Sequence, residues 1–120
     1  MRTGRKITGG RYHANHKKKK VEVPGIPRVV KLRQKRNKFI RGRGGNKRAV
    51  LLSEETVNVI DKKGKAKKVK ITNVLETHAN RFLARQNVLI KGAVIDTELG
   101  KARITNRPSQ EGAVNAILLD

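Results

Sequence analysis

Apolar and polar residues alternate over two short segments in the middle of the chain. In residues 67–72, Val69 and Ile71 alternate with lysines, and residues 56–60 show the same period. A period of two predicts β-strands that each bury one face. The short loop between them contains Gly64 in a lysine-rich context, which predicts a hairpin with this glycine at a positive φ.

Further short apolar segments follow at residues 87–99, 101–107 and 113–120, and glycines and an RPSQEG stretch separate them. Many short strands with frequent turn signals are typical of a small closed or nearly closed antiparallel barrel. We therefore expect a mainly β fold with a barrel of about six or seven strands. Residues 73–87 are the one partly helical stretch, and they are too short for more than one or two turns.

The first part of the chain carries most of the charge. Residues 1–48 hold 18 cations and one acid, a net +17, whereas residues 49–120 hold 12 cations and eight acids, a net +4. A segment with this much charge and so few apolar residues cannot form a hydrophobic core by itself. We expect a basic N-terminal extension over residues 1–27 and a β-barrel domain over residues 28–120, whose first segments add strands to the core.

The whole chain has 120 residues, with 30 Lys and Arg against nine Asp and Glu, giving a net charge of +21. Such a chain binds polyanions, above all nucleic acid. There are no cysteines, and the longest apolar runs cover four residues, whereas a membrane-spanning helix needs about 20. A soluble protein is expected. With only three aromatic residues it is not a typical base-stacking platform, so it should read phosphates, sugars and helix shape.

The stretch RGRGGNKR, residues 41–48, places glycines among four cations. It does not match a nucleotide-binding loop, because no Ser or Thr follows Lys47 and the next residues predict a strand where a helix would be needed. A hairpin turn alone is one interpretation. The second is a hairpin turn whose backbone N–H groups and flanking cations clamp an RNA backbone.

No pattern in the chain predicts catalysis, a metal site or a cofactor. His13 and His16 are spaced for a metal, but neither a cysteine nor a nearby acid completes a ligand set, so they are expected to donate hydrogen bonds. The acids are scattered, and no serine has a paired base. The basic run KKGKAKKVK could be a nuclear import signal or a solvated face, and beside a hairpin it is expected to meet phosphate.

Several separated motifs resemble one family. They are TGGR followed by a basic run, RGRGGNKR, GKAKKVKI, GKARITNRP and EGAVNAILLD, in an order and spacing that cover nearly the whole chain. The sequence closely resembles the archaeal and eukaryotic S8e family of small-subunit ribosomal proteins, and its compact length is similar to that of archaeal members. The N-terminal stretch RYHANHKKKK departs from the more varied aromatic and arginine content expected of the family.

The resemblance implies a structural, non-enzymatic protein of the cytoplasmic ribosome, with a β-barrel body and a long N-terminal extension that penetrates RNA. Its implied partners are small-subunit ribosomal RNA and neighbouring ribosomal proteins, with no cofactor, membrane or small-molecule substrate. The extension is a solvated tail in the free protein, an arm that becomes ordered along phosphates, or both in turn. A DNA-compacting chromatin protein is the alternative that net charge alone allows, and an RNA-cleaving enzyme has no supporting cluster of residues.

The candidate RNA-binding residues fall into three groups. Those of the extension are Arg2, Arg5, Lys6, Gly9, Gly10, Arg11, His13, His16, Lys17, Lys18, Lys19 and Lys20. Those around RGRGGNKR are Arg33, Lys35, Arg36, Lys38, Arg41, Arg43, Gly44, Gly45, Asn46, Lys47 and Arg48. Those on the remaining body are Lys65, Lys67, Lys68, Arg103 and Arg107.

Overall fold

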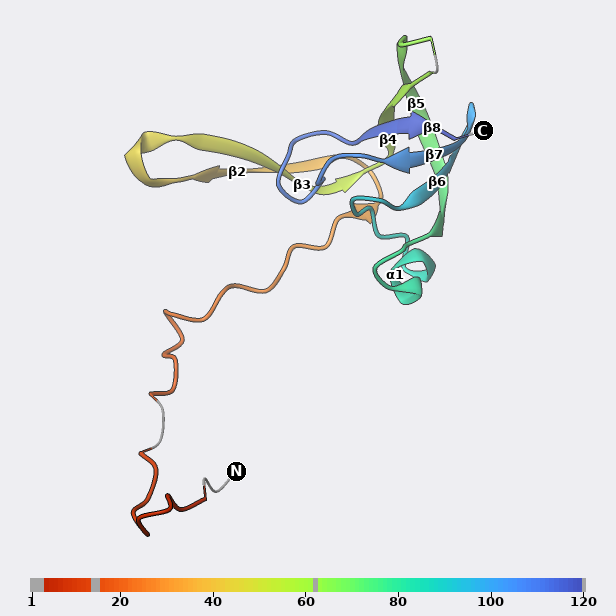
Figure 1. Ribbon diagram of the computed structural model, residues 1–120. Coiled ribbons are helices and arrows are strands. Elements are labelled where there is room, and N and C mark those ends of the chain that lie inside the picture. The colour runs from red at the N-terminus through yellow and green to blue at the C-terminus, as the bar shows by residue number, and fades with distance from the viewer. Residues whose placement is uncertain (1–3, 14–15, 62, 120) are drawn as a thin grey trace.

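The described residues form eight strands, one short α-helix and one 3₁₀ turn. The computed structural model describes residues 4–13, 16–61 and 63–119. Its elements, in chain order, are β1 (Lys31–Leu32), β2 (Arg36–Arg41), a 3₁₀ turn (Arg43–Gly45), β3 (Lys47–Glu54), β4 (Thr56–Ile60), β5 (Ala66–Glu76), α1 (Arg81–Arg85), β6 (Val94–Thr97), β7 (Gly100–Ile104) and β8 (Asn115–Leu118). Their arrangement is shown in Figure 1.

The strands β4, β5, β6, β7 and β8 form a closed barrel. The expected alternation is confirmed, because Val57, Val59, Val69 and Ile71 are all buried. The barrel closes through a parallel pairing of β4 with β8, in which Asn58 lies opposite Asn115, and the other pairings are antiparallel. The mainly β barrel is as expected, but it has five strands and one parallel seam.

The remaining strands form a separate three-stranded sheet in the order β1-β3-β2. The expected contribution to the core is seen, because Val30 and Leu51 add side chains to it, but the strands of this segment do not join the barrel. The physical reason is the composition of β2, which has no fully buried residue along its length. A strand with so little apolar surface gains little by folding onto the core, so β2 and β3 project from the barrel as a long hairpin (Figure 1).

Strand β5 is long enough to turn a corner of the barrel. Its first half pairs with β4 and its second half with β6, and the register with β6 shifts between Ile71 and Asn73 and again between Val74 and Glu76. Such bulges increase the local twist and bend, which a five-stranded barrel requires for closure. The loop before β5 contains Gly64 at φ +77°, which confirms the expected hairpin.

Helix α1 covers only part of the stretch that was expected to be partly helical. Residues 73–76 belong to β5, and the helix begins after Asn80, whose side chain accepts a hydrogen bond from the Phe82 N–H at 2.9 Å. The chain then leaves the helix at Asn87, which has φ +52°. Asparagine tolerates this left-handed conformation better than most residues, so it ends the helix after little more than one turn.

The N-terminal extension leaves the barrel as a long arm (Figure 1). All described residues between 4 and 29 are exposed, and Val30 is the first buried one. The radius of gyration is 20.8 Å, compared with about 14 Å for a compact domain of this length. No helix of the described residues is long and apolar enough to cross a membrane.

Candidate nucleic-acid interface

The far end of the N-terminal extension folds back on itself in a small turn. Gly9, at φ +79°, donates its N–H to the Lys6 carbonyl at 2.9 Å, and Arg5 and Arg11 lie opposite each other in a β-bridge. The Arg5 guanidinium also donates to the Gly9 carbonyl at 3.0 Å, and the Lys6 ammonium lies 5.6 Å from the centre of the Tyr12 ring. The turn therefore groups three of the predicted cations on a few residues.

A second turn organises the lysine run at residues 17–20. The Lys19 N–H donates to the Glu22 carboxylate at 3.0 Å, and the Glu22 N–H donates back to the Lys19 carbonyl at 2.9 Å. The Nε2 atom of His16 lies 3.7 Å from the same carboxylate. The one acid of the extension is thus engaged locally, while the lysine side chains are exposed. Arg2 lies outside the described residues.

The stretch RGRGGNKR forms the tip of the β2–β3 hairpin, as the turn interpretation predicted. The Gly42 N–H donates to the Asn46 carbonyl at 2.7 Å, and the 3₁₀ turn lies between them. Gly44 and Gly45 have φ values of +72° and +79°, a conformation that strains other residues. A Cβ at Gly45 would meet no atom within 4 Å, so the backbone there is open to the approach of another backbone.

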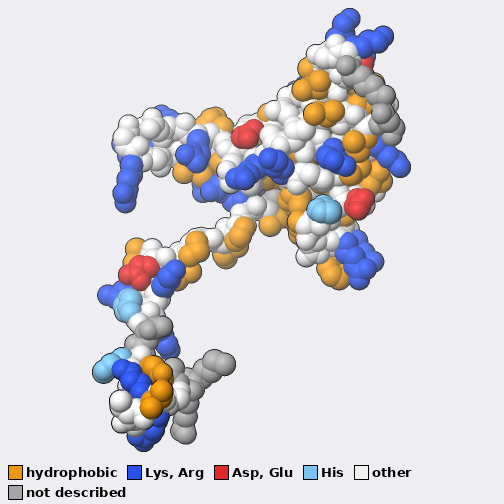
Figure 2. All heavy atoms as spheres, in the orientation of Figure 1, with side chains coloured by type: hydrophobic (Ala, Val, Ile, Leu, Met, Phe, Trp, Pro, Cys, Tyr) orange, Lys and Arg blue, Asp and Glu red, His pale blue; other side chains and the backbone are white. Residues whose placement is uncertain are grey.

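Basic side chains are spaced along the hairpin, among white and hydrophobic atoms (Figure 2). All residues from Arg41 to Arg48 are exposed, and Arg41 lies directly opposite Lys47 in the pairing of the two strands. Like charges placed opposite each other destabilise a hairpin on their own. A bound polyanion removes this repulsion, so the arrangement suits a surface that meets phosphates. The same hairpin also carries the predicted residues Arg36, Lys38, Gly44 and Gly45.

Lys35 differs from the other candidate residues because it pairs with a buried acid. Its ammonium lies 2.9 Å from an Oε atom of Glu54, which is only 2% exposed. The Thr56 hydroxyl donates to the other Oε atom at 2.9 Å, and the Ser53 hydroxyl donates to the Gln34 carbonyl at 2.6 Å. This network fixes the root of the hairpin against the barrel. Sequence reasoning missed Glu54, and its place at the end of a mostly apolar strand was the available signal.

The carboxyl group of Glu54 has a shifted pKa with opposing causes. Burial raises the pKa, but the hydrogen bonds from Lys35 and Thr56 and the positive charge of Lys35 lower it, and the net shift is downward. A group with a lowered pKa stabilises the fold above its unfolded pKa, and this contribution is lost as the pH falls through the folded pKa.

We expect Lys35→Met to lower the free energy of unfolding at neutral pH by about 1–2 kcal/mol, a value discounted because the Lys35 side chain is 48% exposed. The difference from the unchanged protein should shrink as the pH falls through the carboxyl range, to about pH 3. Urea unfolding at both pH values measures it, with Lys38→Met as the control. A difference that stays constant with pH would contradict the Glu54 assignment.

The candidate residues on the barrel do not gather at one place. Lys67 and Lys68 are exposed at the start of β5, where they lie opposite Val59 and Asn58. Arg103 lies at the other end of β5, because it is opposite Val94, which in turn is opposite Glu76. The exposed Lys65 precedes β5, and the exposed Arg107 precedes β8, in the loop that runs beside β3. These residues are therefore separate from the tip of the hairpin.

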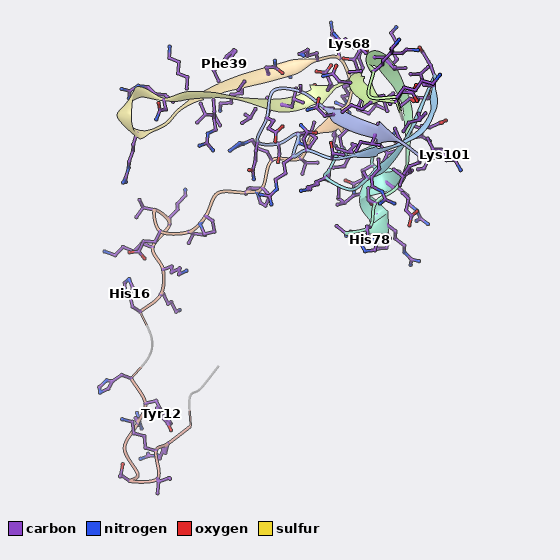
Figure 3. All side chains as sticks on the ribbon, turned by 45° about the horizontal axis from the view of Figure 1, so that its top comes forward. Tyr12, His16, Phe39, Lys68, His78 and Lys101 are labelled. Atoms are coloured by element: carbon purple, nitrogen blue, oxygen red, sulfur yellow. The ribbon has the colours of Figure 1, made fainter. Side chains whose placement is uncertain are left out.

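Two exposed arginines of α1 were not among the candidate residues. Arg81 and Arg85 are four positions apart in a short helix, and this spacing was the signal that could have included them. Arg103 lines a cavity of about 310 Å³ together with Glu76 and His78. His78 lies beside α1 (Figure 3).

Among the described residues, no group of three or more His, Asp or Glu could hold a metal ion.

The chain is similar to proteins of one family over nearly its full length. The family model described as Ribosomal protein S8e matches residues 1–119. The small ribosomal subunit protein eS8 of Methanocorpusculum labreanum is 49% identical over 117 residues, which cover 97% of this chain and 94% of that protein. The eS8 protein of Sulfolobus acidocaldarius is 47% identical over 117 residues, covering 96% and 91%.

Proposed function

Because this chain belongs to the ribosomal protein S8e family, we propose that it is a structural protein of the small subunit of the cytoplasmic ribosome and binds ribosomal RNA. The observation that carries the proposal is that two basic projections, the N-terminal extension and the β2–β3 hairpin, leave one small barrel. We divide the chain into the extension, residues 1–27, and a β-barrel domain, residues 28–120.

The projections suit readout of RNA backbone and shape. Lysine and arginine side chains neutralise phosphates and release the counterions condensed on them, which makes binding strong and dependent on salt. The hairpin tip adds backbone N–H groups and open glycines, and arginine can hold one phosphate with two donors. An A-form RNA helix presents mainly phosphates and 2′-hydroxyl groups, so base-specific contacts are not needed for this role.

The barrel serves as the fixed base for both projections. The extension enters it at Val30, and the Lys35–Glu54 pair joins it to the hairpin. Ribosomal RNA and neighbouring ribosomal proteins are the partners, and assembly of the subunit and translation are the processes served. The family is a structural one, and the relatives' names do not support a DNA-compacting role.

The proposal predicts that Arg43→Glu impairs incorporation into the small subunit while the barrel still folds. The substitution reverses one charge at the hairpin tip, where Arg43 is exposed and far from the core, so it repels phosphate without removing packing. Reconstitution of the purified protein with small-subunit ribosomal RNA and proteins, followed by sedimentation, measures the incorporated fraction. We expect a loss of about tenfold or more.

Lys101→Glu is the matched control, because it makes the same change of charge at an exposed position of β7 outside the candidate surface. Circular dichroism checks that both variants keep the fold. Equal incorporation of the two variants would remove the hairpin tip from the RNA-binding surface. Failure of the unchanged protein to sediment with the small subunit would overturn the proposed function itself.

A further inference from the structure

A groove beside α1 lies apart from the extension and the hairpin. Its volume is about 580 Å³, which falls within the range of small-ligand sites. The lining residues come from the second half of β5, from α1 and from the turn that follows it: Asn73, Val74, Leu75, Arg81, Ala84, Arg85 and Asn87. None of these described lining residues is acidic, so the groove is polar and positively charged.

The helix presents two arginines whose guanidinium groups are held by one aromatic ring. The carbon at the centre of the Arg81 guanidinium lies 5.4 Å from the centre of the Phe82 ring, and that of Arg85 lies 5.8 Å from it. Phe82 is 52% exposed, so its ring contributes little to the core and remains accessible. Contact with an aromatic ring restrains a guanidinium group, but the N–H groups at the edge of the guanidinium can still donate hydrogen bonds. This arrangement favours binding of an anion such as phosphate.

Two asparagines that line the groove share one backbone donor. The side-chain oxygen of Asn73 accepts the Val74 N–H at 2.9 Å, and that of Asn87 accepts the same N–H at 3.4 Å. With their oxygens held there, the amide nitrogens are the atoms left to donate. Leu75, which is 44% exposed, adds apolar surface to the same groove. Donors beside apolar surface suit a nucleobase, whose edge accepts hydrogen bonds and whose faces are apolar.

We propose that α1 and this groove bind one unpaired nucleotide of the RNA. Arg81 and Arg85, held by the Phe82 ring, bind its phosphate, Leu75 contacts the base, and the amides of Asn73 and Asn87 donate to its edge. The proposal rests on the proposed function, since ribosomal RNA supplies the nucleotide. A base inside a duplex is covered by its stacked neighbours, so the groove selects a bulged or looped nucleotide. Charge favours RNA over a neutral protein surface.

Ultraviolet cross-linking of the full chain bound to small-subunit ribosomal RNA tests the proposal, because it joins unpaired bases to the side chains that touch them. Trypsin cuts after Lys70, Arg81, Arg85 and Lys91, so the site is covered by three peptides, 71–81, 82–85 and 86–91. We expect one nucleotide on one of these peptides, and we expect chemical probing of the RNA to show one flexible nucleotide that the protein protects.

Arg81→Ala combined with Arg85→Ala should weaken this cross-link and this protection by about tenfold or more, while most of the binding to RNA remains. Asn87→Gly should weaken them as well, because it removes the amide and keeps the positive φ. Lys91→Ala combined with Lys101→Ala removes equal charge at exposed positions outside the groove and should leave both signals unchanged.

Cross-links confined to the extension and the hairpin would overturn this proposal and leave the proposed function intact. Retention of the cross-link in the arginine pair variant, or cross-linking of these peptides to a neighbouring protein in the assembled subunit, would also overturn it. An unchanged protein that does not bind ribosomal RNA would overturn both the groove assignment and the proposed function.

Discussion

Deletion of residues 1–27 is expected to lower the affinity for ribosomal RNA about a thousandfold at about 0.1 M salt. The deleted segment contains eight of the 30 cations, namely Arg2, Arg5, Lys6, Arg11 and Lys17–Lys20. If about half of them contact phosphates, the slope of log affinity against log salt loses about three to four units from a value near −9 for about ten contacts. The large effect follows from the number of charges lost together.

The deletion should leave the fold intact, because every described residue in this segment is exposed. Filter binding across a salt series measures the slope, and circular dichroism checks the barrel. Replacement of Lys17–Lys20 by glutamine in the full chain is the matched control, and it should remove about half of the slope change. An unchanged slope after deletion would mean that the extension stays unbound in the complex.

Ile95→Ala is expected to lower the free energy of unfolding by about 2–5 kcal/mol. Ile95 is fully buried in β6, where it lies opposite Val74 on one side and Ala102 on the other. Neither neighbour is large enough to fill the space that the substitution leaves, so a cavity remains. Because a small barrel has a marginal stability of about 5–10 kcal/mol, the loss is a large fraction of the total.

Thermal and urea unfolding measure this effect, and we expect the midpoint temperature to fall by about 15 °C. Ile117→Ala is the matched control, since it is the same substitution on β8 at a side chain that is 48% exposed. It should cost less than about 1 kcal/mol. Similar losses for the two variants would show that Ile95 does not lie at the centre of the core.

Local patterns predicted the strands of the barrel well. The alternation around Val69 and Ile71 gave the buried face of β5, and Gly64 marked the hairpin loop, because both depend only on the period of a strand and on the φ that a turn requires. The helix was less predictable. Strand β5 extends to Glu76, so the helix begins later than the sequence indicated. The helix is held by the Asn80 cap and by packing against β5, and this packing exists only in the folded chain.

The candidate interface was predictable as a list of cations but not as a surface. Sequence spacing placed Gly44 and Gly45 in a turn among arginines, and the structure has that turn. It did not show that Lys35 pairs with Glu54, since Lys35 precedes β2 whereas Glu54 ends β3, and the two meet only in the folded chain. It also did not join Asn73 and Asn87 into one groove, because β5 and the end of α1 meet only in the folded chain.

The sequence by itself determined the charge, the extended and exposed N-terminal extension, the glycine turn, the short alternating strands and the family. Each follows from residues close together in the chain or from composition. Only the tertiary structure decided that five strands close the barrel, that β4 and β8 pair in parallel, and that β2 and β3 project from it. These features depend on contacts between segments as far apart in the chain as Asn58 and Asn115. The set of strand pairings that forms is the one that buries the most apolar surface in total.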